Sequence, residues 1–363
     1  MSPRSSRSAA ASGANGRAVA ARPRRSTPKA DPNELLGFYR QMLLIRRFEE
    51  KTAEMYQRAK IGGYCHLNVG EEATCVGLCA GMQPNDYLFT NYREHGYALA
   101  RGIDPGRVMA ELFGRESGVA RGRGGSMHLF DLEKRLMGGY AIVGGQLPLA
   151  TGAGLAIVRK GQPDAVVCQM GDATTNIGAF HESLNLAALW KLPVVYAVIN
   201  NGFGMGTSVE DGSAIAALHE KACAYGIPGV EVDGNDVLRV REAVHEAVER
   251  ARTKRVPSLM NIKSFRLKGH SVVDPDRYRS AEYLKEIRAQ DPLAQVAERL
   301  KDSGVVDDES LADIDEEVER QVNAAVEFAE ESPEPNPEKL FEYSYATQVA
   351  NQPFALPGQS PWA

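Results

Sequence analysis

Two side chains that carry oxygen ligands follow two apolar segments with the composition of buried strands. Asp172 comes just after Ala165–Met170, and Asn201 comes just after Pro193–Ile199. The intervening Ile177–Trp190 has the pattern of a helix, so the two strands should run parallel and end at the same edge of a sheet. Ligands of open α/β sheets bind at that edge. The spacing therefore predicts one site that contains a carboxylate and an amide oxygen.

Mg²⁺ bound to a phosphorylated ligand would suit these oxygens. Mg²⁺ takes about six oxygen ligands, usually one or two from carboxylates and the others from phosphates and water. We expect the side chains of Asp172 and Asn201 and the backbone carbonyl near Phe203 to hold the cation. The amides at the start of the helix after Thr175 would face the phosphates, and Gly171 would leave room for them. A Gly-Asp turn or an Asn-Asn loop alone is common, so the prediction rests on their combination.

The surrounding elements continue the alternation of strand and helix. After a helix-like stretch at Ser213–Tyr225, the sequence predicts a helix at Val237–Thr253 and a strand at Ser258–Ser264. This order is typical of an α/β fold in which helices cover a parallel sheet. A helix should also begin at Asp31-Pro32, and an apolar stripe of helical period runs from Leu311 to Ala329. We therefore expect an α/β domain with a helical C-terminal extension.

The composition divides the chain into a basic start and an acidic body. The net charge is −5, yet residues 1–30 contain seven of the 42 basic residues and no acid, which leaves 35 bases against 47 acids in the rest. An acidic body argues against nucleic-acid binding as the main function. The sequence contains no continuous apolar run of about 20 residues, so we expect no membrane span. The five cysteines form no CxxC pair, so we expect buried thiols in a reducing compartment instead of disulfides or a zinc site.

Composition also predicts the domain boundaries. Residues 1–30 are rich in Ser, Ala, Arg and Gly and are expected to form a disordered basic tail, although a transit peptide has the same composition. Residues 31–346 are expected to form one α/β domain with its C-terminal helices, and residues 347–363 a C-terminal tail. The many glycines between Gly62 and Gly152 predict loops in which the backbone approaches a ligand or another chain.

Several further motifs identify a family when they are taken together with Gly171–Asn201. In order along the chain they are GYCHLNVGEEA (Gly63–Ala73), NYREHG (Asn91–Gly96), GRGGSMH (Gly122–His128), IVGGQLPLATG (Ile142–Gly152) and FRLKGHSVVDP (Phe265–Pro275). From about Asn33 to Ala346 the chain resembles the alpha subunits of the pyruvate dehydrogenase decarboxylating component, in the thiamine-diphosphate-dependent 2-oxo acid dehydrogenase family. The resemblance implies a thiamine-diphosphate-binding fold with thiamine diphosphate and Mg²⁺ as cofactors.

The resemblance also implies roles for individual residues. The cofactor-binding positions are matched by Tyr92, Arg93, Ala141, Val143, Gly171, Asp172, Ala173, Asn201, Phe203 and His270. Arg93 would bind the diphosphate, with a surface ion pair to Glu94 as its alternative role. Asp172, Asn201 and Phe203 match the metal ligands, and His66 and His270 match active-site histidines, whose ordinary pKa lies near neutral pH. Two positions differ from the family pattern, because Ala173 replaces a glycine and Phe203 replaces a tyrosine.

The implied reaction is the oxidative decarboxylation of pyruvate, with transfer of the acetyl group to the lipoyl group of a dihydrolipoyl acyltransferase. The family carries the glutamate that activates the cofactor on a separate beta chain, so an α2β2 heterotetramer is expected and this chain alone should be inactive.

Asp172 and Ile199 favour pyruvate over branched-chain oxo acids, and acetoin dehydrogenase is the first alternative. A noncatalytic scaffold of the same fold is another alternative. A Rossmann dehydrogenase is disfavoured, because no GxGxxG follows the first strand of the strand–helix–strand unit.

Location and regulation depend on features that the sequence leaves open. The enzyme would lie in the cytoplasm of a bacterium, which we favour, or in the mitochondrial matrix of a eukaryote. Ser271 matches a serine that is phosphorylated in animal relatives, but the sequence does not show whether a kinase acts on it.

Overall fold

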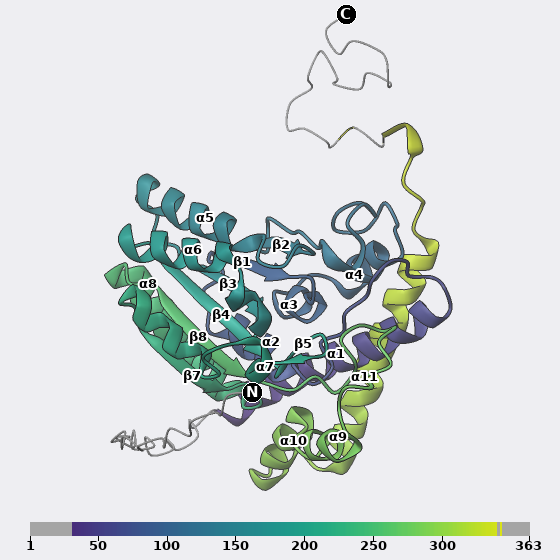
Figure 1. The fold of residues 1–363 in the computed structure, drawn as a ribbon. Coiled ribbons are helices and arrows are strands. Elements are labelled where there is room, and N and C mark those ends of the chain that lie inside the picture. The colour runs from purple at the N-terminus through teal and green to yellow at the C-terminus, as the bar shows by residue number, and fades with distance from the viewer. Residues whose placement is uncertain (1–30, 340–341, 343–363) are drawn as a thin grey trace, which may run out of the picture.

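A six-stranded sheet runs through the centre of the molecule (Figure 1). The computed structural model describes residues 31–339 and residue 342, so the predicted tails at 1–30 and 347–363 and the predicted domain end at 346 lie outside the described residues. Neighbouring strands of this sheet are all parallel, in the order β2-β1-β3-β4-β8-β7. The strands are β1 (Tyr87–Asn91), β2 (Leu136–Tyr140), β3 (Val166–Gly171), β4 (Val194–Asn200), β7 (Gly229–Asp233) and β8 (Ser258–Lys263). The predicted α/β class is confirmed.

Helices cover both faces of the sheet. On one face lie α5, α6 and the 3-10 helix η3 (Leu218–Tyr225), and on the other lies α8, with α2 and α1 in the same core (Figure 1). The helices are α1 (Pro32–Gln57), α2 (Glu72–Ala80), α3 (His95–Ala100), α4 (Pro105–Leu112), α5 (Gln146–Lys160), α6 (Gly178–Leu189), α7 (Val209–Gly212), α8 (Val237–Lys254), α9 (Ala281–Arg288), α10 (Pro292–Asp302) and α11 (Asp308–Glu331).

The alternation of side chains along the central strands builds two cores, one on each face. In β3, Val166 packs with α5 and α6, whereas Val167 packs in the core that contains α1, α2 and α8. In β4, Val194 enters the first of these cores and Val195 the second. A strand whose two faces are both buried has a continuous apolar sequence, and this is why β3 and β4 can be predicted from the sequence.

Both ends of the described chain form helices that pack on the α/β domain. The Asp31 side chain accepts a hydrogen bond from the Asn33 backbone amide at the start of α1, where the sequence predicts a helix start. The predicted apolar stripe is buried in α11 through residues such as Ile314 and Val318. Helix α11, yellow in Figure 1, packs against α4 and α1. The helical C-terminal extension is confirmed. None of the described helices has the length and apolar character needed to cross a membrane.

The glycine-rich range between Gly62 and Gly152 contains predicted loops, such as residues 113–124 and 141–145, together with helices and strands that were not predicted there. Helices α2 to α4, the first half of α5 and strands β1 and β2 lie in this range. Several of its glycines serve close packing instead. A Cβ atom on Gly77 would lie 2.7 Å from Cβ of Val240, and one on Gly81 would lie 2.7 Å from Cβ of Val244. Glycine therefore lets α2 approach α8 closely.

Two further local predictions differ from the structure. The helix predicted at Ser213–Tyr225 forms only as η3 from Leu218 onward, because Ser213 is already in an extended conformation at the end of α7. Cys223 is exposed on η3, whereas the other four cysteines are buried as predicted.

Candidate active site

The carboxyl ends of β1, β3 and β4 meet around one cavity of about 630 Å³. Strand β2 lies on one side of β1, while β3 and β4 extend the sheet on the other, so the sheet order changes direction between β1 and β3. Ligands of open α/β sheets bind at such a point. The lining includes every predicted site residue: His66, Tyr92, Arg93, Ala141, Val143, Gly171, Asp172, Ala173, Asn201, Phe203 and His270. The structure thus brings these residues together, and their individual roles stay predictions.

Asp172 and Asn201 lie just past the ends of β3 and β4. Asp172 begins the 3-10 helix η2 (Asp172–Asn176) and is 5% exposed. Burial raises the pKa of Asp172 to about 6. Asn201 Nδ2 donates a hydrogen bond to Glu71 Oε1 at 2.8 Å, and Asn201 Oδ1 is buried without a hydrogen-bond partner. A buried carboxylate and a buried unpartnered amide oxygen are costly on their own, and together they fit the ligand set of a cation.

The third predicted cation ligand is the backbone carbonyl of Phe203. This residue begins the short strand β5 (Phe203–Gly204), which pairs with β6 (Thr207–Ser208). The Phe203 ring packs against Tyr278 and Tyr283, with centroid distances of 5.7 Å to each. Residues 31–339 contain no cluster of three or more His, Cys, Asp or Glu side chains that could hold a metal ion. The predicted ligands are instead one carboxylate, one side-chain amide oxygen and one backbone carbonyl oxygen. These are hard oxygen ligands of the kind that Mg²⁺ takes.

The substitution of the family glycine by Ala173 causes no backbone strain. Ala173 is not among the residues with a positive φ angle, so its conformation is open to any L-residue. The helix predicted at Ile177–Trp190 is α6 (Gly178–Leu189), and η2 lies between it and β3. The amides nearest to the cavity therefore belong to η2.

Arg93 follows β1 and joins two segments of the site. Its side chain is buried, Nη1 donates to the carbonyl oxygen of Leu67 at 2.7 Å, and Nη2 donates to that of His270 at 2.8 Å. A guanidinium has five N–H donors, so others stay available for an anion in the cavity. The alternative role in a surface ion pair with Glu94 is wrong, because Glu94 is fully buried and accepts its hydrogen bonds from other groups.

His66, Tyr92 and His270 form a cluster of three rings in the cavity. The centroids of His66 and His270 are 5.0 Å apart, and the Tyr92 centroid lies 4.3 Å from His66 and 5.8 Å from His270. Burial, assisted by the charge of Arg93, lowers the pKa of His66 to about 2 and the pKa of His270 to about 4. Both imidazoles are therefore neutral at pH 7 in this chain. The pKa near neutrality expected from the sequence does not hold, and the neutral rings can orient a ligand through hydrogen bonds but are weak bases.

A network of hydrogen bonds holds the loop that carries His270. The Asp274 carboxylate accepts from the backbone amide of His270 at 2.6 Å and from the Tyr278 hydroxyl at 2.8 Å. The Arg279 guanidinium donates to the backbone carbonyl of Arg266 at 2.5 Å. These bonds, with the one from Arg93, place His270 at the cavity instead of in solvent.

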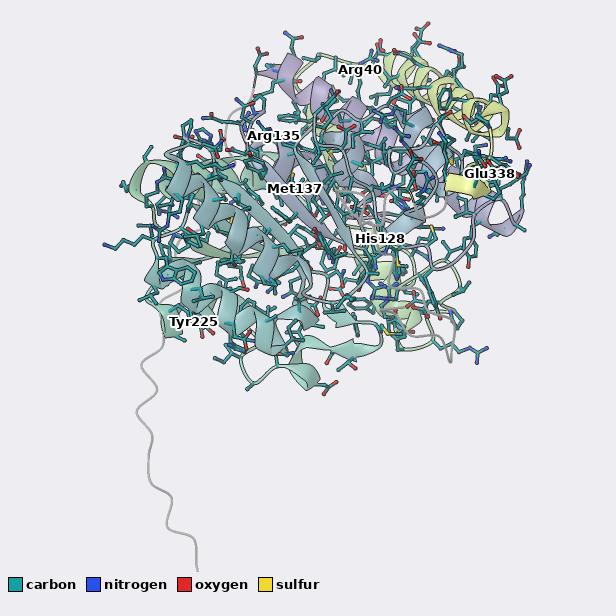
Figure 2. The ribbon with its side chains drawn as sticks, turned by 90° about the horizontal axis from the view of Figure 1, so that it is seen from above. Arg40, His128, Arg135, Met137, Tyr225 and Glu338 are labelled. Carbon is teal, nitrogen blue, oxygen red and sulfur yellow. The ribbon has the colours of Figure 1, made fainter. Side chains whose placement is uncertain are left out.

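Some residues of the cavity have no predicted role. Glu71 lies in the GEEA part of a motif quoted above, and Gln169 is a polar residue within the apolar strand β3. Gln169 Oε1 accepts from the Asn91 amide at 2.9 Å and so connects β3 to the end of β1. A polar side chain inside an apolar strand was the signal that could have identified it. His128, labelled in Figure 2, binds the Gly139 carbonyl through Nδ1 at 3.0 Å and does not line the cavity.

Comparison with known proteins gives matches over most of the chain. The family of dehydrogenase E1 components matches residues 40–338. A Zymomonas mobilis protein named pyruvate dehydrogenase E1 component subunit alpha is 47% identical over 316 residues, which cover 86% of this chain and 88% of that protein. A Rhizobium meliloti protein of the same name is 44% identical over 307 residues, covering 84% and 88%. The somatic, mitochondrial form from Homo sapiens is 40% identical over 329 residues, covering 90% and 83%.

Proposed function

The chain belongs to the family of dehydrogenase E1 components, and on this basis we propose that it is the alpha subunit of a thiamine-diphosphate-dependent pyruvate dehydrogenase. The enzyme decarboxylates pyruvate oxidatively and passes the acetyl group to the lipoyl group of a dihydrolipoyl acyltransferase. The observation that carries the proposal is the cavity at the carboxyl edge of the sheet, where Asp172, Arg93 and the unpartnered Oδ1 of Asn201 lie together. The names of the relatives described above support pyruvate as the substrate.

The residues of the cavity divide into groups that would hold different parts of the cofactor. Asp172, Asn201 and the Phe203 carbonyl would hold Mg²⁺, and Arg93 would bind the diphosphate. Tyr92, Ala141, Val143, Gly171 and Ala173 would line the cofactor. Thiamine diphosphate supplies the decarboxylation chemistry when it is bound, while the protein positions it and excludes water. His66 and His270, both neutral, would act on the substrate through hydrogen bonds that orient its reacting atoms.

The partners and the location also form part of the proposal. A beta subunit would complete the site in an α2β2 heterotetramer and contribute the activating glutamate. Support comes from the apolar side chains that stay exposed beside the cavity, among them Tyr64, Val143 and Met205. The proposed location is the cytoplasm of a bacterium, or the mitochondrial matrix if the source is a eukaryote.

The test is cofactor binding and acetyl transfer by this chain co-purified with its beta subunit. We expect transfer from pyruvate to lipoamide, weaker or no transfer from acetoin and branched-chain oxo acids, and no activity of either chain alone. Asp172→Ala should weaken thiamine diphosphate binding by more than about 100-fold in calorimetry with Mg²⁺, since loss of a direct ligand should exceed the roughly 10- to 100-fold cost of an outer-shell partner. The exposed Asp302→Asn is the control. Equal binding by parent and Asp172→Ala would overturn the proposed site.

A further inference from the structure

Glu71 is a buried carboxylate in the cavity that has no role in the function proposed above. It is 1% exposed and lies between a turn and the first residue of α2, with its backbone amide bonded to the carbonyl of Asn68 at 2.8 Å. A carboxylate at such a position needs partners that satisfy its charge, because an isolated buried charge is very costly. The identity and direction of those partners indicate what Glu71 does.

Glu71 accepts hydrogen bonds from two amide side chains. Oε1 accepts from Asn201 Nδ2 at 2.8 Å, and Oε2 accepts from Asn68 Nδ2 at 3.2 Å. Arg93 Nε lies 3.9 Å from Oε2 and partly balances the charge. The orientation of Asn68 is set independently, because its Oδ1 accepts from the backbone amide of Gly96 at 3.0 Å. Hydrogen bonds therefore connect the fixed backbone amide of Gly96 to Asn201 through Asn68 and Glu71, and both amide side chains donate to Glu71.

These hydrogen bonds leave only one orientation for the side-chain amide of Asn201. An ionised carboxylate accepts hydrogen bonds and donates none, so it binds the NH₂ group of an amide and disfavours the oxygen. The Asn201 oxygen must then face away from Glu71, and Oδ1 is the atom that is buried without a partner. If the Asn201 amide were reversed, its oxygen would face the Glu71 carboxylate and its NH₂ group would face the cation position.

We propose that Glu71 is a positioning residue that turns the Asn201 side chain so that its Oδ1 faces a bound divalent cation. The inference rests on the proposed function for the identity of the cation, Mg²⁺ with thiamine diphosphate, and adds to it the residue that orients one ligand. Outer-shell residues of this kind orient the direct ligands of a metal and determine part of the metal affinity.

The near-isosteric Glu71→Gln variant should reverse the direction of the hydrogen bond between position 71 and Asn201. Asn68 stays a donor, so the oxygen of Gln at position 71 should face Asn68 and its NH₂ group should face Asn201. Asn201 would then turn its oxygen toward position 71 and its NH₂ group toward the cation. In the assembled enzyme, we expect the Mg²⁺ concentration for half-maximal thiamine diphosphate binding, measured by calorimetry, to rise by about 10- to 100-fold. The melting temperature without cofactor should stay close to that of the parent.

A double variant separates orientation from charge. In Asn68→Asp with Glu71→Gln, the new aspartate can accept from both Gly96 and position 71, so the oxygen at position 71 faces Asn201 again. The double variant has the same net charge as the parent, and its Mg²⁺ requirement should return to within about threefold of the parent value. If Glu71→Gln does not assemble, the double variant alone decides, because a raised Mg²⁺ requirement in it contradicts the orienting role.

The outcomes also distinguish this inference from the proposed function. A parent enzyme that binds no thiamine diphosphate at any Mg²⁺ concentration would overturn the proposed function. A parent that binds it, with a Glu71→Gln variant of unchanged Mg²⁺ requirement, would overturn the orienting role of Glu71 alone. Equal impairment of the single and double variants would show that the negative charge at position 71 matters and not the direction of its hydrogen bonds.

Discussion

The two histidines of the cavity differ from ordinary surface histidines because they stay neutral as the pH falls. Burial and the nearby Arg93 charge lower the pKa of His66 to about 2 and the pKa of His270 to about 4. In the unfolded chain both would titrate near pH 6.5. Between about pH 6.5 and pH 4 the unfolded state therefore binds more protons than the folded state, and the folded state loses stability as the pH falls. We expect these two histidines to make the melting temperature fall with decreasing pH across this window, in opposition to Asp172, whose raised pKa of about 6 favours the folded state as the pH falls.

Replacing His66 by Gln should make that fall shallower, because one of the groups that protonates only on unfolding is removed. The measurement is the melting temperature of the chain at several pH values between 7 and 4.5. The exposed His245→Gln serves as the control and should leave the slope unchanged. If the two variants have the same slope, His66 is not the group that couples folding to protons.

The role of a side chain could be predicted where it depends on the neighbouring sequence. It could not be predicted where it depends on contacts with residues far away in the sequence. Asp172 and Asn201 follow apolar strands directly, so their meeting at one sheet edge is a consequence of the strand–helix–strand pattern. Glu71 meets Asn201 across 130 positions of sequence, and no local pattern indicates that pair. The neutral state of His66 and His270 likewise depends on burial and on Arg93, which only the folded chain places beside them.

Helix α4 holds the glycine-rich loop that follows it through a single carboxylate. Glu111 is fully buried, and its two oxygens accept from the backbone amides of Ala120, Gly122, Gly124 and Gly125 at 2.7–3.1 Å. Glu111→Gln would turn one oxygen into an NH₂ group that faces two N–H donors. Because hydrogen bonds to a charged group contribute about 1.5–3 kcal/mol each, we expect the free energy of unfolding to fall by roughly 2–4 kcal/mol.

Two measurements check this prediction. Urea unfolding gives the loss of stability, and hydrogen exchange should show faster exchange of the amides at Ala120–Gly125. The matched control is Glu242→Gln on the exposed side of α8, which should alter neither quantity. Unchanged exchange in Glu111→Gln would mean that the loop is held by other contacts.

Elements with a long, regular apolar pattern agree with prediction to within a residue or two, as β3, α6 and β4 show. Strand β2 has five residues and includes Gly138 and Gly139, so its composition indicates a loop and only its pairing with β1 makes it a strand. Strand β7 is partly exposed along its length and is likewise defined by its pairing with β8. These edge strands depend on contacts across the sheet, which a reading of neighbouring residues cannot supply.

Several large apolar side chains stay exposed around the cavity instead of packing in either core. They are Tyr64, Ile142, Val143, Met205 and Val273, and Ile142 is 78% exposed. Tyr64, Val143 and Met205 line the cavity itself, and Ile142 is the neighbour of Val143. Grouped exposed apolar side chains are typical of interaction surfaces. The proposed beta subunit would cover this rim and close the cavity to water, which joins assembly and cofactor binding in one event.

Ile142 offers a direct test of that connection. Burying an isoleucine contributes about 1.5–3 kcal/mol, so Ile142→Glu should raise the Kd for the beta subunit by at least about tenfold, as measured by sedimentation velocity. Thiamine diphosphate affinity should fall with it and recover at high beta-subunit concentration, because the residues that hold the cofactor are unchanged. The control is Leu189→Glu, which is also exposed, at 68%, but lies at the end of α6, near the amino ends of the strands. If Leu189→Glu weakens assembly as much as Ile142→Glu does, the rim of the cavity is not the surface that binds the beta subunit.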